Sequence, residues 1–490
     1  MQWRFRYALS SILFFLVLFF AVGLIGCGGS GGGSAGPING PFNNSSLNGT
    51  YAFSFTGVNT FGFLAVAGSF QANGSGALTG GTVDINSGNG VFTNQSLAGS
   101  YNVHNNGQGT ATFTTSTATF DINFVIVSGQ RALIIRFDNN STASGSIDRQ
   151  NSSAFSPAAL GGTFAFNLSG IDTGSHTLVS AGAIDNNGAG GISSGVQDLN
   201  DNGSPTTNQA VTGTYSVSST NPNGRGLMSL NTVLGTLSFA FYVVDSNRLK
   251  LIEIDNLPVL AGDAFRQQFP QSTASVSGPL AFTLGGASSS AIPFVVGGVL
   301  STDGSGNVTS GSQDINNNGG ITQNVALTGT YSVGADGRGF LTLNGASGTT
   351  NFIIYPTTSG LQMVQVDLGE ASIGAAFNQS GPFSTSTVSG TYGLNLTGVL
   401  GNHEIDSTAQ FSADGSGHLT GAMDINNGGA LLPNLSLSGN SSISANGRGT
   451  GQLNSSFGPQ NVIFYAINNS RVLFIEVDSD IVAVGELEHQ

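Results

Sequence analysis

The sequence predicts an all-β protein built from four tandem repeats. Glycine supplies 74 of the 490 residues, and valine, isoleucine, phenylalanine and threonine are plentiful, as in strand-rich proteins. Apolar and polar residues alternate over short stretches such as Leu249-Lys250-Leu251, a period of two that is typical of half-buried strands. One set of motifs also returns four times along the chain, which is the mark of a repeat architecture.

Each repeat opens with a similar strand sequence. The four openings are GTYAFSFTG at Gly49, GTFAFNLSG at Gly162, GPLAFTLGG at Gly278 and GTYGLNLTG at Gly390. A later glycine turn recurs at Gly109, Gly226, Gly339 and Gly449, so the period is about 110–117 residues. We therefore expect four β repeats at 47–150, 160–267, 276–379 and 388–490.

Eight strand-like runs fit within one repeat, and short connections rich in Gly, Asn and Asp join them. Sequential hairpins of this kind predict an eight-stranded antiparallel up-and-down barrel, whose closure removes exposed strand edges. Such a barrel holds either packed side chains or one small ligand. Half-repeat similarity, as between LNGTY at Leu47 and LAGSY at Leu97, leaves a β-propeller of eight four-stranded half-repeats open. A β-sandwich is the other alternative.

The N-terminus predicts a secretory signal and a lipid anchor. Arg4 and Arg6 precede an apolar run at 12–25 that is shorter than the roughly 20 residues of a membrane-spanning helix. The sequence Leu24-Ile25-Gly26-Cys27 then resembles the lipobox of bacterial lipoproteins. That resemblance implies removal of residues 1–26 and lipidation of Cys27, with a free or buried thiol as the alternative. Gly28, rather than Asp, is similar to the pattern that directs lipoproteins to the outer membrane.

A linker follows the cysteine, and the repeats begin after it. Residues 27–46 comprise Cys27 and a Gly/Ser-rich segment, a composition typical of flexible coil. The repeats as a whole resemble uncharacterised Gly/Asn-rich repeat lipoproteins of bacteria, a resemblance that implies no known activity. Their Gly-Thr-Tyr openings are also similar to those of avidin-type and lipocalin-type barrels, but no binding residue carries over from that likeness.

The net charge of the chain argues against anionic partners. The formal net charge is −14, which argues against nucleic acid or an anionic membrane surface. Cys27 is the only cysteine, so no disulfide can form within the chain. We expect the membrane to be one partner, bound through the lipid anchor at Cys27. A surface glycan or a protein is the other partner that the sequence leaves open.

An Asp-[Ile/Leu]-Asn triplet recurs in every repeat and is the strongest candidate site. Its members are Asp84 with Asn86, Asp198 with Asn200, Asp314 with Asn316, and Asp424 with Asn426. Alternating side-chain oxygens before a glycine turn can bind Ca²⁺, although the twelfth-position glutamate of an EF-hand is missing. The alternative is an Asx turn that caps its own hairpin. No other cofactor is predicted.

A second recurring set suggests structural polar pairs. Gly-Arg-Gly turns place Arg225, Arg338 and Arg448 at equivalent positions, where the first repeat has Gln108. A later strand carries Glu253 in the second repeat and Glu476 in the fourth. We predict pairs of Arg225 with Glu253 and of Arg448 with Glu476. The third repeat, with Arg338 and Gln365, does not fit this scheme, and a ligand-binding arginine remains open.

Catalytic signatures are lacking in this sequence. The five histidines occupy unrelated positions in their repeats, and no spacing predicts a nucleophile–His–acid set, a zinc site or a phosphate loop. We therefore expect a lipid-anchored cell-envelope protein with a non-catalytic binding, adhesive or structural role. A small-ligand-binding barrel lipoprotein is the alternative. An envelope glycan hydrolase is the third, since paired carboxylates can meet in space without a sequence signature.

Overall fold

The structure is a computed structural model that describes residues 41–217 and 223–490. Its described part forms four antiparallel barrels in tandem, which confirms the all-β prediction of one eight-stranded barrel per repeat. The predicted signal peptide, Cys27 and most of the linker lie outside the described residues. The propeller and sandwich alternatives are wrong, because the first and last strands of each repeat pair with each other and close the sheet.

The first and fourth barrels each consist of eight consecutive strands. Barrel 1 contains β1 (Asn48–Asn59), β2 (Gly62–Asn73), β3 (Ala77–Ser87), β4 (Gly90–Val103), β5 (Gln108–Thr114), β6 (Thr119–Ser128), β7 (Arg131–Asp138) and β8 (Ser141–Arg149). Barrel 4 contains β27 (Ser389–Leu400), β28 (His403–Asp414), β29 (His418–Asn427), β30 (Ala430–Ile443), β31 (Arg448–Ser455), β32 (Gly458–Ala466), β33 (Arg471–Glu476) and β34 (Ile481–His489).

In the second and third barrels the fourth strand is divided into two segments. Barrel 2 contains β9 (Gly162–Ile171), β10 (Thr177–Asn186), β11 (Gly191–Asp201), β12 (Ser204–Ala210), β13 (Thr212–Val217), β14 (Arg225–Thr232), β15 (Gly235–Asp245), β16 (Arg248–Glu253) and β17 (Val259–Arg266). Barrel 3 contains β18 (Ser277–Ser288), β19 (Pro293–Asp303), β20 (Asn307–Asn317), β21 (Gly320–Ala326), β22 (Thr328–Val333), β23 (Gly339–Gly345), β24 (Gly348–Thr357), β25 (Gly360–Gln365) and β26 (Glu370–Asn378). One-turn 3₁₀ helices precede the barrels: η1 (Asn44–Ser46), η2 (Ser152–Ala154), η3 (Ala158–Leu160), η4 (Thr273–Ser275) and η5 (Thr385–Thr387).

The glycine-rich turns have a clear local cause. Between β2 and β3, the Asn73 side chain accepts the backbone N–H groups of Ser75 and Ala77 at 2.8 and 3.0 Å. Gly74 and Gly76 take φ values of +75° and +102°, which L side chains rarely adopt. Asp303 and Asp414 cap the corresponding turns of barrels 3 and 4 in the same way. Asn187 caps the same turn in barrel 2, so an Asx turn closes this hairpin in all four barrels.

Apolar side chains fill each barrel interior. In barrel 1 the rings of Phe53, Phe70 and Phe113 pack together, with centroids 4.9–5.9 Å apart. Equivalent buried apolar clusters occupy barrels 2, 3 and 4. Large side chains at close packing leave little room inside an eight-stranded barrel.

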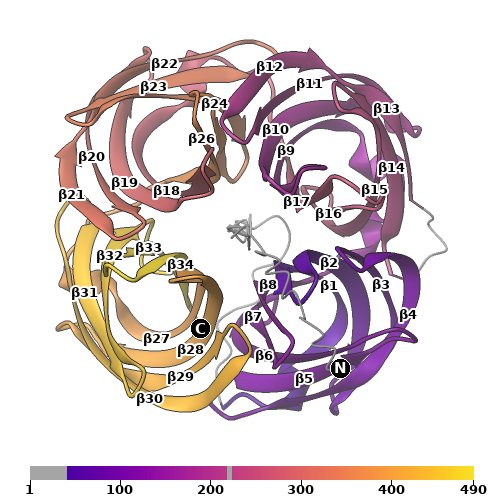
Figure 1. The fold of residues 1–490 in the computed structure, drawn as a ribbon, viewed down its shortest axis with the longest axis vertical. Helices are drawn as coiled ribbons and strands as arrows, with labels where there is room; N and C mark the ends of the chain where they lie inside the picture. The colour runs from indigo at the N-terminus through magenta and orange to yellow at the C-terminus, as the bar shows by residue number, and fades with distance from the viewer. Residues whose placement is uncertain (1–40, 218–222) are drawn as a thin grey trace, which may run out of the picture.

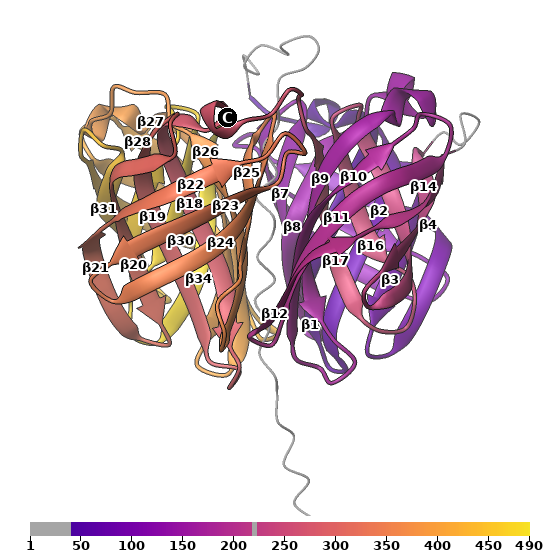
Figure 2. The same cartoon turned by 90° about the horizontal axis from the view of Figure 1, so that it is seen from above.

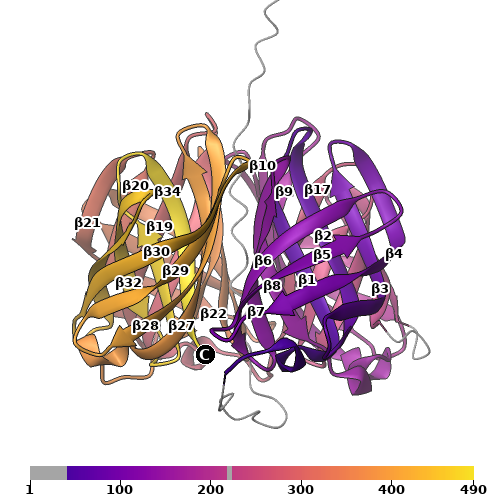
Figure 3. The ribbon, with the colours of Figure 1, turned by 90° about the horizontal axis from the view of Figure 1, so that it is seen from below.

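The four barrels form a closed ring around a central axis (Figure 1), and side views show them standing beside one another in one layer (Figures 2 and 3). Strands β27–β29 of barrel 4 pack against β6–β8 of barrel 1, so the last barrel meets the first. The other three junctions bury apolar clusters of nine to thirteen residues. The closing junction has only Val125, Val127 and Leu133 in its cluster.

Candidate functional site: the junctions and the central axis

The Asp-x-Asn triplets lie at the ends of β3, β11, β20 and β29, and their side chains face the next barrel. All eight side chains are buried. The Nδ2 amide of each asparagine donates to backbone carbonyls of the neighbouring barrel near the turn between its last two strands. Asn86 reaches Glu253 and Asp255, and Asn426 reaches Arg136, Asp138 and Ser141. Asn200 reaches Gln365, Asp367 and Glu370, and Asn316 reaches Glu476, Asp478 and Ile481. The asparagines thus join all four junctions, including the one that closes the ring.

The aspartates bind arginines of the next barrel at three junctions. Arg225 Nε and Nη2 donate to Asp84 at 2.8 and 2.7 Å, a bidentate pair. Arg338 contacts Asp198 at 2.8 and 2.6 Å, and Arg448 contacts Asp314 at 2.8 and 2.6 Å. A buried tyrosine hydroxyl completes each cluster: Tyr242 donates to Asp84, Tyr355 to Asp198 and Tyr465 to Asp314. We call each Asp–Arg–Tyr cluster a clasp.

The predicted polar pairs within one repeat are therefore wrong. Arg225 pairs with Asp84 rather than with Glu253, and Arg448 pairs with Asp314 rather than with Glu476. The reason is the position of each arginine at the start of the fifth strand of its barrel, where it faces the preceding barrel. Glu253 instead accepts the amide of Asn86 at 2.8 Å and the Asp255 N–H at 2.5 Å, and burial raises its pKa to about 9. Burial likewise raises the pKa of Glu476 to about 10.

The clasp geometry does not fit a bound Ca²⁺ ion. At three junctions the aspartate oxygens already accept an arginine, a tyrosine and one backbone N–H. The asparagines point their amide nitrogens, not their oxygens, at the partner carbonyls, and a cation needs oxygen ligands. Across residues 41–217 and 223–490, no group of three or more acidic, histidine or cysteine side chains is arranged to hold a metal. The Asx-turn interpretation applies in part: Asn316 and Asn426 accept the N–H of Gly319 and Gly429.

The closing junction has no clasp. Gln108 stands where the other barrels have arginine, and its amide donates to the Ala422 carbonyl at 3.4 Å. Asp424 keeps the backbone bond from Asn434 at 2.7 Å, and burial raises its pKa. Two further acids, Glu404 and Asp406, are buried on β28 of this junction, at 4% and 0% exposure.

The acid pair has no opposite charge to offset its burial. Within the described part of the chain, no arginine or lysine forms an ion pair with Glu404 or Asp406. Burial raises the pKa of Asp406 to about 7, and burial together with Asp406 raises the pKa of Glu404 well above its usual range. In barrel 1 the same register positions on β2 hold Phe63 and Ala65. The seam that closes the ring is therefore polar where the others are apolar.

A glutamine clamp that the sequence analysis missed joins each barrel to the next. Gln150, Gln267, Gln379 and Gln490 each follow the last strand of a barrel. Each Nε2 donates to two backbone carbonyls of the following barrel, at 2.7–3.2 Å. Gln490, the last residue of the chain, reaches Asn106 and Ile126 of barrel 1. The signal was available in the sequence as a glutamine recurring with the repeat period.

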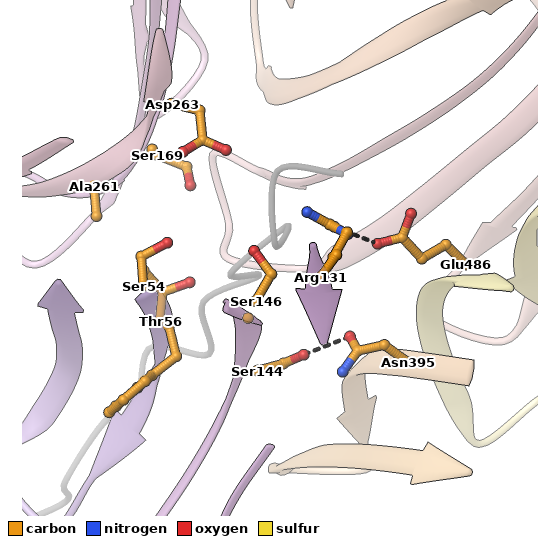
Figure 4. A pocket seen from close by; sticks show the side chains of 13 residues that line it. Ser54, Thr56, Arg131, Ser144, Ser146, Ser169, Ala261, Asp263, Asn395 and Glu486 are labelled. Carbon is orange, nitrogen blue, oxygen red and sulfur yellow. Dashed lines mark hydrogen bonds and ion pairs between the residues drawn. The ribbon is translucent and has the colours of Figure 1, made fainter. Parts of the chain in front are cut away.

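A buried network of charges joins three of the barrels, and two of its members, Arg131 and Glu486, contact each other in the pocket of Figure 4. Asp148 accepts Arg131 at 2.8 Å, Arg248 at 3.0 Å and Lys250 at 2.9 Å. Arg131 also contacts Glu486 and Glu488 of barrel 4, at 3.1 and 2.9 Å. Although burial opposes ionisation, Arg248, Lys250 and Arg131 hold the pKa of Asp148 well below its usual range.

This network joins barrels 1, 2 and 4 but not barrel 3. Arg471 and Asp263 complete it, each paired with a charge of its own barrel. Barrel 3 has the neutral residues Gly360 and Gln362 at the positions of Arg248 and Lys250. The network contains four basic side chains and four acidic side chains, so each buried charge has an opposite charge near it, as burial requires. The arrangement is structural, since every charged side chain in it has a partner within the network.

Comparison with known proteins adds no family to this description. No protein-family model matches the chain, and no curated protein matches it either. None of the helices in the described part of the chain is long and apolar enough to cross a membrane.

The clasps should contribute measurably to stability, and the chain provides its own control. Asp314→Ala removes the bonds from Arg448 and Tyr465 and leaves both groups unpaired, so we expect a loss of about 3 kcal/mol. Asp424→Ala removes an equivalent backbone bond and a hydrogen bond with the Asn123 side chain but leaves no arginine unpaired, so it should cost about 1–2 kcal/mol. Urea denaturation followed by circular dichroism measures both. Equal losses would contradict a stabilising role for the clasp.

The terminal glutamine should hold the ring closed. Gln490→Ala leaves two carbonyls of barrel 1 without their amide donor, and no covalent linker spans this junction. We expect faster amide hydrogen exchange in β28 and in β6–β8, corresponding to about 1–2 kcal/mol. Gln379→Ala removes the equivalent bonds at a covalently linked junction and should leave exchange at the closing seam unchanged. Unaltered exchange in Gln490→Ala would show that the clamp does not contribute to closure.

Proposed function

We propose that this protein is a non-catalytic, lipid-tethered scaffold of the bacterial cell envelope, which presents the outer faces of a ring as binding or adhesive surfaces. The observation that carries the proposal is the location of the recurring polar side chains. The recurring Asp, Asn, Arg and Gln side chains are used between barrels, and apolar side chains fill the barrel interiors. The outside of the ring remains available to a partner.

The outer faces carry few charges, among them the exposed Asp121 of β6, and are rich in hydroxyl and amide groups. On β22 the exposed side chains are Thr328, Thr330 and Ser332, and on β30 they include Ser438, Asn440 and Ser442. Four copies of such a face on one ring favour multivalent attachment, in which weak contacts add up through high effective concentration. The small-ligand alternative gains no support from the interiors, since a binding barrel would keep a cavity with converging polar groups.

Lipidation is the first part of the proposal to test. The full chain, expressed in a bacterium that is fed an alkyne-labelled fatty acid, should acquire the label and partition into detergent. Cys27→Ala should lose both properties, because the thiol is the acylated atom. Label on the Cys27→Ala variant, or its absence from the native chain, would refute the anchor.

The binding role is tested separately. The purified ring should sediment with isolated envelope polymers, such as peptidoglycan sacculi, and a single weak contact should be reinforced by repetition. Hydrolysis of the polymer, measured as released reducing ends, would contradict the non-catalytic role. A ring that neither sediments nor hydrolyses would overturn the proposed binding function.

A further inference from the structure

A groove of about 600 Å³ lies between barrels 3 and 4, beside the clasp of this junction, since Asn324 in its lining donates its backbone N–H to Asp314. It is bounded by β19–β21 of barrel 3, by the segment 379–383 that leads into barrel 4, and by the turn that contains Asn446. This volume falls within the roughly 300–1,000 Å³ of small-molecule sites. The barrel interiors are filled, so this junction offers more room to a ligand than they do.

The groove lining contains no charged residue. Its polar side chains are the hydroxyls of Ser301, Ser310 and Ser312 and the amides of Asn324, Asn446 and the clamp residue Gln379. Pro382 and the half-buried Phe383 ring provide an apolar wall. Hydroxyls and carboxamides both donate and accept hydrogen bonds, as a neutral hydroxyl-rich ligand requires.

Comparison of the junctions explains why the groove is open here. In the first junction, Asn223 Nδ2 donates to Thr82 Oγ1 at 2.7 Å and bridges the two barrels. Asn446 and Ser312 occupy the equivalent positions in the third junction. Ser312 is 8% exposed, and its hydroxyl has no hydrogen-bond partner within the described residues. A buried hydroxyl without a partner is costly, and rotation of the Ser312 side chain toward the groove would let a ligand supply one.

The other two junctions lack this chemistry. The second has Val196 and Asp336 at the two positions, which replaces the hydroxyl by an apolar group and adds a charge. The fourth has Ala422, and Asn106 there donates to Gln108 at 2.8 Å. The combination of an unpaired buried hydroxyl, a free volume and an uncharged lining occurs at the third junction.

We propose that this groove binds a neutral saccharide of one or two sugar rings. The serine and asparagine groups would pair with sugar hydroxyls, and the Phe383 ring and Pro382 would cover an apolar face of the sugar. An anionic or cationic sugar would find no opposite charge. The inference deepens the proposed binding function by naming a ligand class, and it rests on that function only for its biological use.

The test measures binding of neutral disaccharides to the full ring. Cellobiose, maltose and N,N′-diacetylchitobiose are titrated by calorimetry and by saturation-transfer NMR, with glucuronic acid and glucosamine as charged probes. We expect at least one neutral disaccharide to bind with millimolar or tighter affinity. The double variant Ser312→Val/Asn446→Asp carries the residues of the second junction, so the fold should tolerate it. It should weaken binding at least tenfold.

Thr82→Val, at the same place in the first junction, is the matched control and should leave saccharide affinity unchanged. Equal affinity in the double variant, preference for a charged probe, or no binding of any neutral disaccharide would overturn the inference. If the double variant loses disaccharide binding but still sediments with envelope polymer, the proposed binding function stands and this groove has no part in it. If the native ring binds a neutral disaccharide but does not sediment with envelope polymer, the groove is a saccharide site and the proposed envelope-binding function is wrong.

Discussion

Asp148→Asn is expected to lower the free energy of unfolding by about 3–5 kcal/mol, because it leaves buried cations without their shared anion. Arg131, Arg248 and Lys250 all donate to this carboxylate, and their side chains are 1–7% exposed. Lys250 has no other ion-pair partner within the described part of the chain. The loss should appear as a lower urea midpoint, measured by circular dichroism or intrinsic fluorescence.

A second variant separates charge imbalance from lost packing. Burial already lowers the pKa of Lys250, so removal of Asp148 should favour its neutral form. Adding Lys250→Leu, the residue that barrels 1 and 4 have at this position as Leu133 and Leu473, should restore much of the stability. Lys250→Leu alone tests whether the network tolerates the change. No rescue in the double variant would contradict the view that unpaired charge causes the loss.

The ring should lose stability as pH rises from about 4 to above 7. The pKa values of Asp406 and Glu404 are higher in the folded ring than in the unfolded chain, so the folded state binds more protons over this interval. Their contribution is complete below the unfolded values near 4 and is lost as the carboxyls ionise at the buried seam. For Asp406, a rise from 3.8 to about 7 corresponds to a loss on the order of 4 kcal/mol.

A variant with the barrel 1 residues at these two positions isolates the contribution of Glu404 and Asp406 to the pH dependence of stability. Glu404→Phe/Asp406→Ala places the residues of Phe63 and Ala65 at the closing seam. Its melting temperature should exceed that of the native chain at pH 8, and the difference should shrink towards pH 4. Other acids with raised pKa values, such as Glu253 and Glu476, remain in both proteins and cancel in the comparison. Parallel pH profiles would show that the acid pair does not set the pH dependence.

The fold was predictable because its signals are local and repeated. Period-two alternation marks strands, and Asx-capped glycine turns such as the one at Asn73 join neighbouring strands into hairpins. Closure followed from the count of eight strands and the need to cover their edges. None of this depends on contacts between repeats.

The site was only partly predictable. The recurrence of Asp84, Asn86 and Arg225 at fixed positions identified a repeated polar set, but not its pairing. Arg225 and Asp84 are 141 residues apart, while Glu253 of the same repeat is much nearer in sequence. One regularity was visible in the sequence: the arginine occurs in repeats two to four and is replaced by Gln108 in the first, but this does not show which aspartate each arginine meets.

The barrels and the repeat period could be predicted from the sequence, because they follow from neighbouring residues within one chain segment. Which side chains meet across barrels became visible in the folded ring alone. Ring closure brings Gln490 to barrel 1, Asp424 opposite Gln108 rather than an arginine, and Asp148 among the cations of two barrels. Those contacts depend on how whole barrels are placed around the axis, and a one-dimensional pattern does not encode that placement.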